Sequence, residues 1–414
     1  MKILHVTQNY YPSVGGTQHT IKKISEIFVE EYNDSVIVLT SNSLYGPNRQ
    51  KFEEIALREE VLNGVTVKRH PFLRSHIPLI KLWGKFLSKA FKKPLPDFLI
   101  SLLSGPISRG MVKDIKSTDA DVIGASSIHY RFADYPQWRK HTTKPKPFVM
   151  YGALHLHDTK LLPLYIERAK TADYYIANTL FEKNYLIQQG LDEKNIKVIG
   201  AGSDILEKAD FSITDDELRR NYDIAKGDII ITYIGRQEAF KGIPVLAEAY
   251  SSLGASFKNI HLFICGAVGA YTEELKKIIE INKGIRLLSN ITDRQKTEIL
   301  RVTDILVLPS KEESFGVVFL EAWSFSKPVV GAGIGAVASL IEEGKDGLLF
   351  KPDDVQDLAD KLRLLVENEP LRKELGENGK AKYLANYTWD AIAKKFRDVY
   401  QLAINKFTLE QSRQ

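Results

Sequence analysis

Residues 304–328 read DILVLPSKEESFGVVFLEAWSFSKP, and this stretch decides which fold the rest of the chain is expected to adopt. Its first part, DILVLPS at 304–310, is typical of a buried parallel strand that leads into a loop. The following residues predict a helix whose first turn contains Ser314, Phe315 and Gly316. A strand, a small-residue loop and a helix N-terminus together favour an anion site, because unpaired backbone N–H groups and the helix dipole point at one place.

Two glutamates of this stretch, Glu313 and Glu321, are separated by eight positions. With Glu313 at the helix mouth and Glu321 inside the helix, they lie roughly 12 Å apart along the axis, at about 1.5 Å per residue. A glycoside hydrolase needs a carboxylate pair about 5 to 9.5 Å apart, so this spacing does not suit that reaction. It suits contacts to the two ends of an extended ligand with a phosphate between them, such as a sugar nucleotide. By itself, the spacing is more often that of an amphipathic core helix with solvated glutamates, so the context decides.

That context includes Gly235–Gly242, GRQEAFKG, which follows the first strand expected in the second half of the chain. Arg236 and Lys241 leave the strand end between glycines, so both can reach a diphosphate, the arginine as a fork and the lysine as a point charge. An isolated segment of this kind is more often a solvated turn. Its occurrence together with Glu313 and Glu321 favours a functional interpretation.

The two segments resemble the GR…KG and paired-glutamate motifs of the retaining, nucleotide-sugar-dependent glycosyltransferases of family 4, within the glycosyl transferases group 1. This resemblance implies the glycosyltransferase B fold. It implies that Arg236 and Lys241 hold the donor diphosphate and stabilise a leaving group that gains negative charge in the transition state. It implies that Glu321 hydrogen-bonds the ribose. It also implies that Glu313 orients the sugar together with the backbone amides around Phe315, Gly316 and Val317.

Other loops extend the resemblance. Residues 12–18, PSVGGTQ, resemble the family's P-x-x-GG loop before a helix expected to begin near Thr17, and Gly16 would let the backbone approach the donor. Without the other motifs, a plain strand-to-helix turn explains this segment equally well. Gly266 and Ile291 occupy positions where the family makes backbone contacts to the nucleotide base.

Two histidines follow a strand expected near residues 147–151. The family often has a histidine at the end of this strand, beside the donor sugar. The resemblance assigns that role to His155, because Lys160 follows five places later as in several members. His157 is the alternative, and a single histidine at such a place is more often structural.

Two further patterns point to other ligands. Gly331–Ala336 satisfies G-x-G-x-x-A, the dinucleotide fingerprint, but it comes late in its sheet, so a donor-binding glycine turn explains it better. Asp119 and Asp121 form a D-x-D pattern, which binds a metal in a different glycosyltransferase fold. Strand residues follow it directly, so a helix-to-strand turn is the better interpretation. No metal and no cofactor are expected, because Arg236, Lys241 and helix dipoles supply positive charge.

Strand-like and helix-like segments alternate along all 414 residues, which predicts α/β units with mostly parallel sheets. The chain is too long for one core, and the charged spacer near residues 200–227 is the best boundary. We expect two Rossmann-like domains facing across a cleft: an acceptor-binding domain at 1–205 and a donor-binding domain at 206–386. The resemblance implies that a final helix at 387–414 crosses back to the N-terminal domain.

The composition predicts a soluble protein, because no apolar run approaches the roughly 20 residues that span a bilayer. Its single cysteine, Cys265, excludes an internal disulfide and a cysteine-based zinc site. The expected location is the cytoplasm.

Residues 68–93 contain eight Lys or Arg and no Asp or Glu, so the remainder of this +5 chain is net negative (5 − 8 = −3). Lysines 81, 85, 89 and 92 form one helical stripe, and apolar residues fill the other side. This suits a helix lying on an anionic membrane surface, at the inner face of the membrane. A helix that packs its aromatic face on the domain, with its lysines in water, is at least as good an explanation. A nucleic-acid partner is not expected.

The sequence as a whole predicts a retaining glycosyltransferase that moves a sugar from a nucleotide-diphosphate donor to a hydroxyl of a saccharide or lipid-linked acceptor. Polysaccharide, glycolipid or other glycoconjugate synthesis is the expected setting. The alternatives are a nucleotide-sugar epimerase of the same fold and a non-catalytic subunit that binds a sugar nucleotide. The sequence does not identify the base, the sugar or the acceptor.

Overall fold

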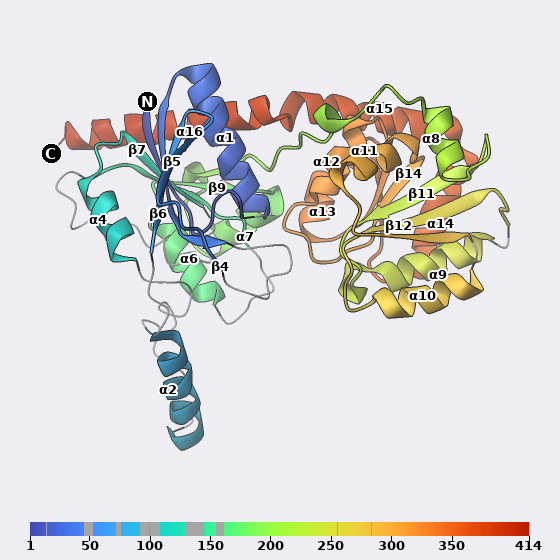
Figure 1. Ribbon diagram of the computed structural model, residues 1–414, viewed down its shortest axis with the longest axis horizontal. Helices are drawn as coiled ribbons and strands as arrows, with labels where there is room; N and C mark the ends of the chain where they lie inside the picture. Colours follow the sequence, from blue (N-terminus) through green and yellow to red (C-terminus); the bar gives the residue numbers. More distant parts are fainter. Residues whose placement is uncertain are drawn as a thin grey trace. The chain divides into compact units, whose positions relative to one another are not determined.

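The computed structural model shows two compact α/β units, each built on its own mainly parallel sheet (Figure 1). The first unit contains Met1–Asn178, Glu182–Gly200 and Ile392–Gln414, and the second contains Thr179–Phe181 and Ala201–Ala391. The residues described by the structure are 1–13, 15–44, 53–71, 76–91, 99, 108–126, 128, 145–154, 161–254, 256–282 and 284–413. This confirms the α/β class expected from the alternating strand-like and helix-like segments.

Among the described residues, the first unit has an eight-stranded sheet in the order β10-β9-β8-β7-β1-β2-β6-β5. Its strands are β1 Lys2–Val6, β2 Ser35–Ser41, β5 Glu59–Leu62, β6 Val65–His70, β7 Val122–Ser126, β8 Phe148–Tyr151, β9 Tyr174–Ala177 and β10 Ile196–Val198. Neighbouring strands are parallel except β5 and β6, which form an antiparallel hairpin at one edge. Two further short strands, β3 Ser43–Leu44 and β4 Glu53–Glu54, pair with each other. The helices of this unit are α1 Gly16–Tyr32, α2 His76–Phe91, α4 Arg109–Ser117, α6 Leu162–Lys170, α7 Leu180–Gln188 and most of α16 Trp389–Gln411.

The second unit has a six-stranded sheet in the order β13-β12-β11-β14-β15-β16, and all of its described strand pairs are parallel. Its strands are β11 Ile229–Ile234, β12 Ile260–Gly266, β13 Ile285–Ser289, β14 Ile305–Leu308, β15 Val329–Ala332 and β16 Leu348–Phe350. Its helices are α8 Asp215–Asn221, α9 Ile243–Gly254, α10 Thr272–Ile281, α11 Asp293–Val302, α12 Val317–Ser324, α13 Gly335–Leu340, α14 Val355–Glu367 and α15 Glu369–Asn386. The strand order reverses between β11 and β14, and ligands of open α/β sheets bind outside the carboxyl ends of the strands at such a reversal.

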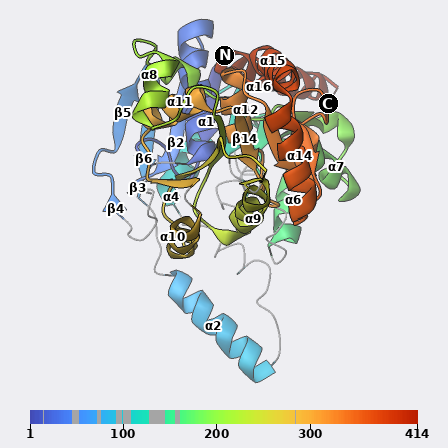
Figure 2. The ribbon, with the colours of Figure 1, turned by 90° about the vertical axis from the view of Figure 1, so that its right-hand side faces the viewer.

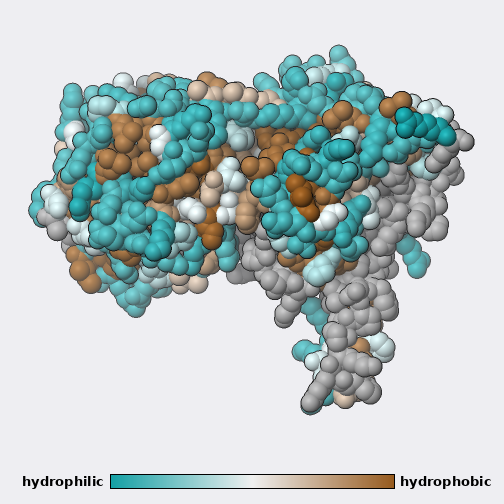
Figure 3. Space-filling view, turned by 180° about the vertical axis from the view of Figure 1, so that it is seen from behind, coloured by the Kyte–Doolittle hydropathy of each residue, from teal (hydrophilic) through white to brown (hydrophobic). Residues whose placement is uncertain are grey.

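Helices cover both faces of the second sheet. Figure 1 shows α9 and α10 on one face and α11 and α12 on the other, and Figure 2 shows α14 beside α9. Coverage on both faces explains why the strands are nearly continuous apolar runs, with every residue of β14 buried. Phe263, Phe319 and Trp323 lie fully buried between these layers. On the molecular face shown in Figure 3, hydrophilic residues predominate and leave smaller apolar patches between them. Within the described part of the chain, no helix is both long enough and apolar enough to cross a bilayer.

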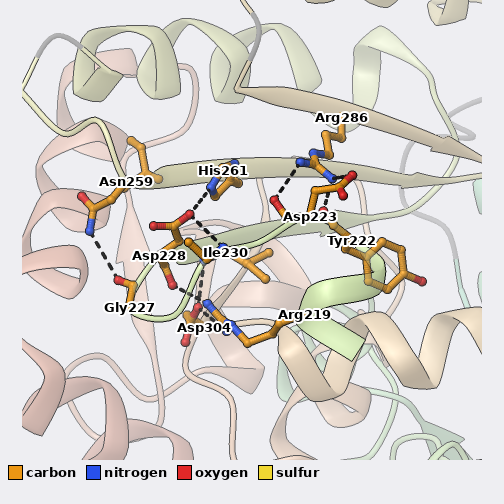
Figure 4. A network of polar contacts seen from close by, with 12 residues as sticks. Arg219, Tyr222, Asp223, Gly227, Asp228, Ile230, Asn259, His261, Arg286 and Asp304 are labelled. Atoms are coloured by element: carbon orange, nitrogen blue, oxygen red, sulfur yellow. Dashed lines mark hydrogen bonds and ion pairs between the residues drawn. The ribbon is translucent and has the colours of Figure 1, made fainter. Parts of the chain in front are cut away.

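A polar network fixes the amino ends of the strands in the second unit (Figure 4). Asp304, just before β14, accepts a hydrogen bond from the backbone N–H of Ile230 at 2.8 Å. Arg219 of α8 lies 3.5 Å from Asp304 and donates to the carbonyl oxygen of Asp228 at 2.5 Å. The Asp228 carboxylate contacts His261 of β12 at 2.8 Å. Three neighbouring strands are thereby tied at their starts, which fixes where their opposite, carboxyl ends lie.

The last helix, α16, is part of the first unit. Its Tyr400 hydroxyl lies 2.9 Å from Nε2 of His5 in β1, and Nδ1 of His5 lies 2.7 Å from the Ser25 hydroxyl of α1. Arg397 of the same helix donates to Asp34 at 2.8 Å, and Asp34 also pairs with the N-terminal amine. The return of the final helix to the first domain, expected from the resemblance, is confirmed by these contacts.

The start of α12 differs from the expected one. The helix begins at Val317, so Ser314 and Phe315 lie in the preceding loop and Gly316 is the N-cap. Gly316 has φ 92° and ψ 54°, and this left-handed conformation cannot be part of a right-handed helical turn. The expectation that the first turn contains these three residues was therefore wrong.

Burial of His5 predicts a loss of stability in mild acid. Desolvation lowers its pKa from about 6.5 to about 3, so between these values the unfolded chain holds a proton that the folded chain does not. The free energy of unfolding should therefore fall as the pH drops below 6.5, with a His5 share of up to about 1.4 kcal/mol per pH unit. Thermal or urea unfolding of the wild type and a His5→Phe variant between pH 7.5 and 5 measures this share.

His5→Phe should itself be less stable at pH 7.5, because Ser25 and Tyr400 lose their buried hydrogen-bond partner. The difference in stability between the two proteins should then narrow as the pH falls. A difference that stays constant across the pH range would contradict the assignment.

Candidate functional site

Two loops lie at the reversal of strand order in the second unit. One contains Gly235–Gly242 after β11, and the other contains Ser310–Gly316 after β14. Their backbones approach closely because Gly242 has φ 79° and no side chain: a Cβ there would lie 2.3 Å from the carbonyl oxygen of Pro309. The GRQEAFKG segment and the loop that contains Glu313 are therefore adjacent at the place where such folds bind ligands.

The adjacency brings Lys241 and Glu313 into an ion pair. The Lys241 ammonium lies 2.6 Å from a Glu313 carboxylate oxygen, and each side chain is only 15% exposed. Limited solvent access strengthens the attraction between the two charges and raises the cost of removing either partner. Of the four residues predicted to carry catalysis, these two are in direct contact.

Arg236 lies in the same loop, with an exposed side chain. Its guanidinium lies 5.6 Å from the ring centroid of Phe240, and the Lys241 ammonium lies at the same distance from that ring. Phe240 therefore has two cations near its ring, and the attraction to the ring limits the orientations of the Arg236 and Lys241 side chains. The Tyr233 hydroxyl donates to the carbonyl oxygen of Arg236 at 2.8 Å and holds its backbone. The result is a positively charged loop beside β14.

Gln237 was not predicted, although it holds three loops together. It is fully buried, and its amide nitrogen donates to the carbonyl oxygen of Gly266 at 3.2 Å and to the Ser289 hydroxyl at 3.1 Å. The Thr272 hydroxyl donates to its amide oxygen at 2.7 Å. A glutamine in a charged, polar segment gives no sequence signal of such a role.

Gly266 and Ile291, predicted to contact the base, lie at the carboxyl ends of two neighbouring strands. Gly266 is the last residue of β12, and Ile291 lies in the loop after β13. Gly266 has φ 128°, and a Cβ there would lie 2.1 Å from the carbonyl oxygen of Gly235, so a side chain does not fit. Asn290, the residue before Ile291, donates its backbone N–H to the carbonyl oxygen of Gly266 at 2.7 Å. Ile291 is half-buried. Both residues thus belong to the same edge of the sheet as the charged loops.

The N-terminus of α12 adds backbone donors to this edge. Gly316 is its N-cap without a side-chain hydrogen bond, and Val317, the first helical residue, is 37% exposed. The first amides of an α-helix have no partner inside the helix, and the dipole makes this end positive. Phe315 is buried against Tyr387, with ring centroids 5.8 Å apart, and anchors the loop before the helix.

Glu321 of α12 is 7% exposed. One carboxylate oxygen, Oε1, lies 2.5 Å from the ammonium of Lys296 in α11. The other, Oε2, is buried without a hydrogen-bond partner among the residues described. Buried polar atoms are normally paired, so this oxygen calls for an explanation. Lys296 was not predicted, because its distance from Glu321 in the sequence hides the contact.

The remaining predicted site residues belong to the first unit. Gly16 opens α1 and is exposed, one residue before the start that the sequence suggested. His155 and its alternative His157 lie outside the described residues. The chain just before them is fixed, because the backbone N–H of Leu154 donates to the buried Glu182 at 3.1 Å.

The two other patterns have local structural explanations. The Asp119 carboxylate lies 2.6 Å from the Lys2 ammonium, and Asp121 accepts a hydrogen bond from the Lys2 backbone at 2.7 Å. These acids therefore lie in the turn between α4 and β7 and fix it to Lys2 of β1, as expected of a helix-to-strand turn. Gly331–Ala336 runs from β15 into α13, at the far side of β14 from β11.

Comparisons with known proteins bear on the fold and on the class of protein. Residues 214–382 match the family model described as glycosyl transferases group 1. An uncharacterized glycosyltransferase of Methanocaldococcus jannaschii is 22% identical over 98% of this chain and 99% of its own length. The D-inositol 3-phosphate glycosyltransferase of Corynebacterium urealyticum is 30% identical over 56% of this chain, and the chain covers only 57% of that relative.

Among solved structures, HepE of Anabaena in complex with UDP-glucose has a TM-score of 0.70 at 19% identity. The match covers 97% of this chain and 99% of HepE, so it concerns the fold of both units. The glycosyltransferase B fold expected from the resemblance is therefore confirmed. Residues 214–382 thus form a domain that matches the glycosyl transferases group 1 family, and the enzyme class that the comparisons support is that of a glycosyltransferase.

Proposed function

We propose that this glycosyltransferase moves a sugar from a nucleoside diphosphate donor to an acceptor hydroxyl, with retention at the anomeric carbon. The observation that carries the proposal is the pairing of Lys241 with Glu313 beside Arg236 and the N-terminus of α12. These groups gather positive charge at the reversal of strand order. HepE, which shares the fold, was crystallised with UDP-glucose, which makes a nucleotide sugar the natural first candidate for the donor.

In this proposal, the donor diphosphate replaces Glu313 as the partner of Lys241. Lys241, Arg236 and the first amides of α12 then face the phosphate oxygens, which gain negative charge as the bond to the sugar breaks. The Glu313 carboxylate, released from Lys241, accepts a hydrogen bond from a sugar hydroxyl. Cationic side chains and helix amides thus take the part that a metal ion plays in other transferases, so no metal is part of the proposal.

Retention follows from a reaction on one face of the sugar. The bond between the anomeric carbon and the diphosphate breaks, and the acceptor oxygen attacks from the side that the diphosphate leaves. The acceptor proton passes to the departing phosphate oxygen, so atoms and charges balance without an enzyme nucleophile. His155 lines this reacting face in the proposal. The first domain, expected at residues 1–205, would bind a saccharide or lipid-linked acceptor.

Nucleotide binding is the first test. UDP, GDP and ADP should be compared with their monophosphates in a thermal-shift assay, because a ligand that binds only the folded state stabilises it. At least one diphosphate should raise the melting temperature clearly more than its monophosphate. At a concentration of 100 times Kd, the stabilisation is about 2.7 kcal/mol. In Arg236→Ala, the difference between the thermal shifts caused by the diphosphate and by the monophosphate should be smaller than in the wild type. Equal shifts with monophosphates and diphosphates would contradict a diphosphate site.

Catalysis is the second test, with a sugar conjugate of the nucleotide found above. Lys241→Ala and Glu313→Ala should each lower the rate of donor hydrolysis or transfer about 100-fold or more, because transition-state charge loses its stabilisation. Lys311→Ala is the matched control: Lys311 is an exposed lysine of the same region that pairs with Asp353 at 2.7 Å. Rates near that of the wild type in both site variants would refute the assignment.

We further propose that α2 contacts an anionic membrane surface at the cytoplasmic side. Four large apolar residues of this helix are more than half exposed, and their spacing places them in one stripe: Leu79, Leu82, Trp83 and Phe86. A neighbouring stripe contains the exposed Lys81, Lys85 and Lys89, and the helix has no acidic residue.

These exposures support a surface contact of α2 over the alternative that its aromatic face packs on the domain. An apolar stripe flanked by lysines is the arrangement of helices that lie in the headgroup region of a bilayer. Contact through α2 would hold the enzyme where lipid-linked acceptors are found.

Vesicle binding tests this contact. Replacement of Lys81, Lys85 and Lys89 by glutamine should reduce co-sedimentation with vesicles that contain anionic lipid. The binding free energy should weaken by roughly 1 kcal/mol for each lysine near the surface. In a control variant, glutamine replaces Lys276 and Lys277, which are exposed lysines of α10. High salt should weaken binding of the wild type. Equal partitioning of the α2 and control variants would end the proposal.

A further inference from the structure

A cavity of about 550 Å³ lies in the second unit at the amino ends of β14 and β15. It is therefore at the opposite edge of the sheet from the loops that contain Lys241 and Glu313. Its walls come from the chain leading into α8, the ends of α11 and α12, and α15, which lie at the upper side of this unit in Figure 1. Sites for small molecules are typically cavities of about 300 to 1,000 Å³, so this one has room for a small organic ligand.

Arg301, at the end of α11, holds one wall of the cavity in place. This side chain is 7% exposed, and its Nε donates to the Asp215 carboxylate at 2.9 Å. Its Nη2 donates to the carbonyl oxygen of Ile213 at 2.7 Å, and its Nη1 donates to that of Asp210. The guanidinium also lies 4.9 Å from the ring centroid of Phe211. The loop before α8 is thus fixed, and most donors of Arg301 are already used.

Lys327, just before β15, is bonded far less completely. Its ammonium donates to the carbonyl oxygen of Arg301 at 2.7 Å, which is the one hydrogen bond that it forms with the described residues. Contact with the end of α11 uses one of three N–H donors. Burial lowers the pKa of Lys327 from its usual 10.5, although the charges of Asp304 and Asp215 oppose this shift. A desolvated ammonium with unfilled donors is costly, so an acceptor from outside the chain would stabilise it.

A second lysine and two aromatic rings complete the cavity. Lys380 of α15 is half-buried in its wall, and no residue described by the structure forms an ion pair or hydrogen bond with its ammonium. The ring of Phe211 is 64% exposed, and that of Phe325 is half-buried. With Lys327 protonated, three cations and two carboxylates line the cavity, a net charge of +1 (3 − 2): Arg301, Lys327, Lys380, Asp215 and Asp216.

We propose that this cavity is a second ligand site, which binds a small organic anion. The carboxylate or phosphate group of the ligand accepts hydrogen bonds from Lys327 and Lys380, and its apolar part packs against Phe211 and Phe325. Such a ligand supplies the acceptors that Lys327 lacks, while Arg301 keeps the wall in its shape. The site is separate from the proposed nucleotide site, because the two lie at opposite ends of the strands.

Three probes that share a phenyl ring test the site: benzoate, phenyl phosphate and the neutral benzyl alcohol. Calorimetry and thermal shifts should show binding of at least one anion to the wild type, and the anion that binds identifies the preferred charged group. Benzyl alcohol should bind at least 10-fold more weakly. Lys327→Met keeps the side-chain length and removes the charge, so the affinity for the anion should fall about 10- to 100-fold, because hydrogen bonds to a charged group are lost.

Two variants serve as controls for this measurement. Lys345→Met removes an exposed lysine of the same unit that pairs with Glu342 at 2.9 Å, and it should leave the affinity unchanged. Lys241→Ala should also retain the anion, because Lys241 lies at the other edge of the sheet. Loss of binding in Lys241→Ala would place the anion in the proposed nucleotide site and overturn the inference.

A second measurement localises the anion without any substitution. Wild-type protein is treated briefly with acetic anhydride with and without the anion, and acetylation of each lysine is quantified by mass spectrometry. The anion should protect Lys327 and Lys380 and leave Lys345 unprotected. Absence of binding by both anions, equal binding of benzyl alcohol, or an affinity that persists in Lys327→Met would each refute the proposed site.

Discussion

The site depends on how closely two backbones approach each other at the carboxyl ends of β11 and β14. Gly242 leaves no room for a side chain against Pro309, and Gly316 turns the chain through a left-handed conformation before α12 begins. Together they bring Lys241 to Glu313 and leave the first amides of α12 at the same edge. The absence of a side chain at these glycines therefore allows the two loops to approach, and this approach places the charged residues beside each other.

Much of the fold could be predicted because alternation of apolar strands with helices is a local property of the sequence. The loop at Gly235–Gly242 and the strand before Ser310 were also predicted in the correct places. Glycines and charged residues after a buried strand are a strong local signal of a loop. The start of α12 was misplaced because Phe315 and Gly316 fit a helical pattern. Only the φ angle of Gly316, which is 92°, shows that the helix begins later.

Contacts between distant segments could not be predicted from one sequence. Gln237 has no motif of its own, yet its buried amide joins the loops after β11, β12 and β13. Lys296 likewise gains its importance only from its contact with Glu321, 25 positions away. The role of such a polar residue depends on which residues it contacts. Those contacts are known only when the order of the strands in the sheet is known.

The contact of Tyr400 with His5 spans 395 positions of the chain, so β1 is synthesised long before the helix that packs against it. The hydroxyl of Tyr400 also fills the space beside Gly124, where a Cβ on Gly124 would lie 2.1 Å from it. While the ribosome is still translating the second unit, the first therefore has an unfilled gap in its core. The first unit thus begins to be synthesised before the second but is completed after it, and incomplete packing of this kind exposes apolar surface that favours aggregation until α16 is made.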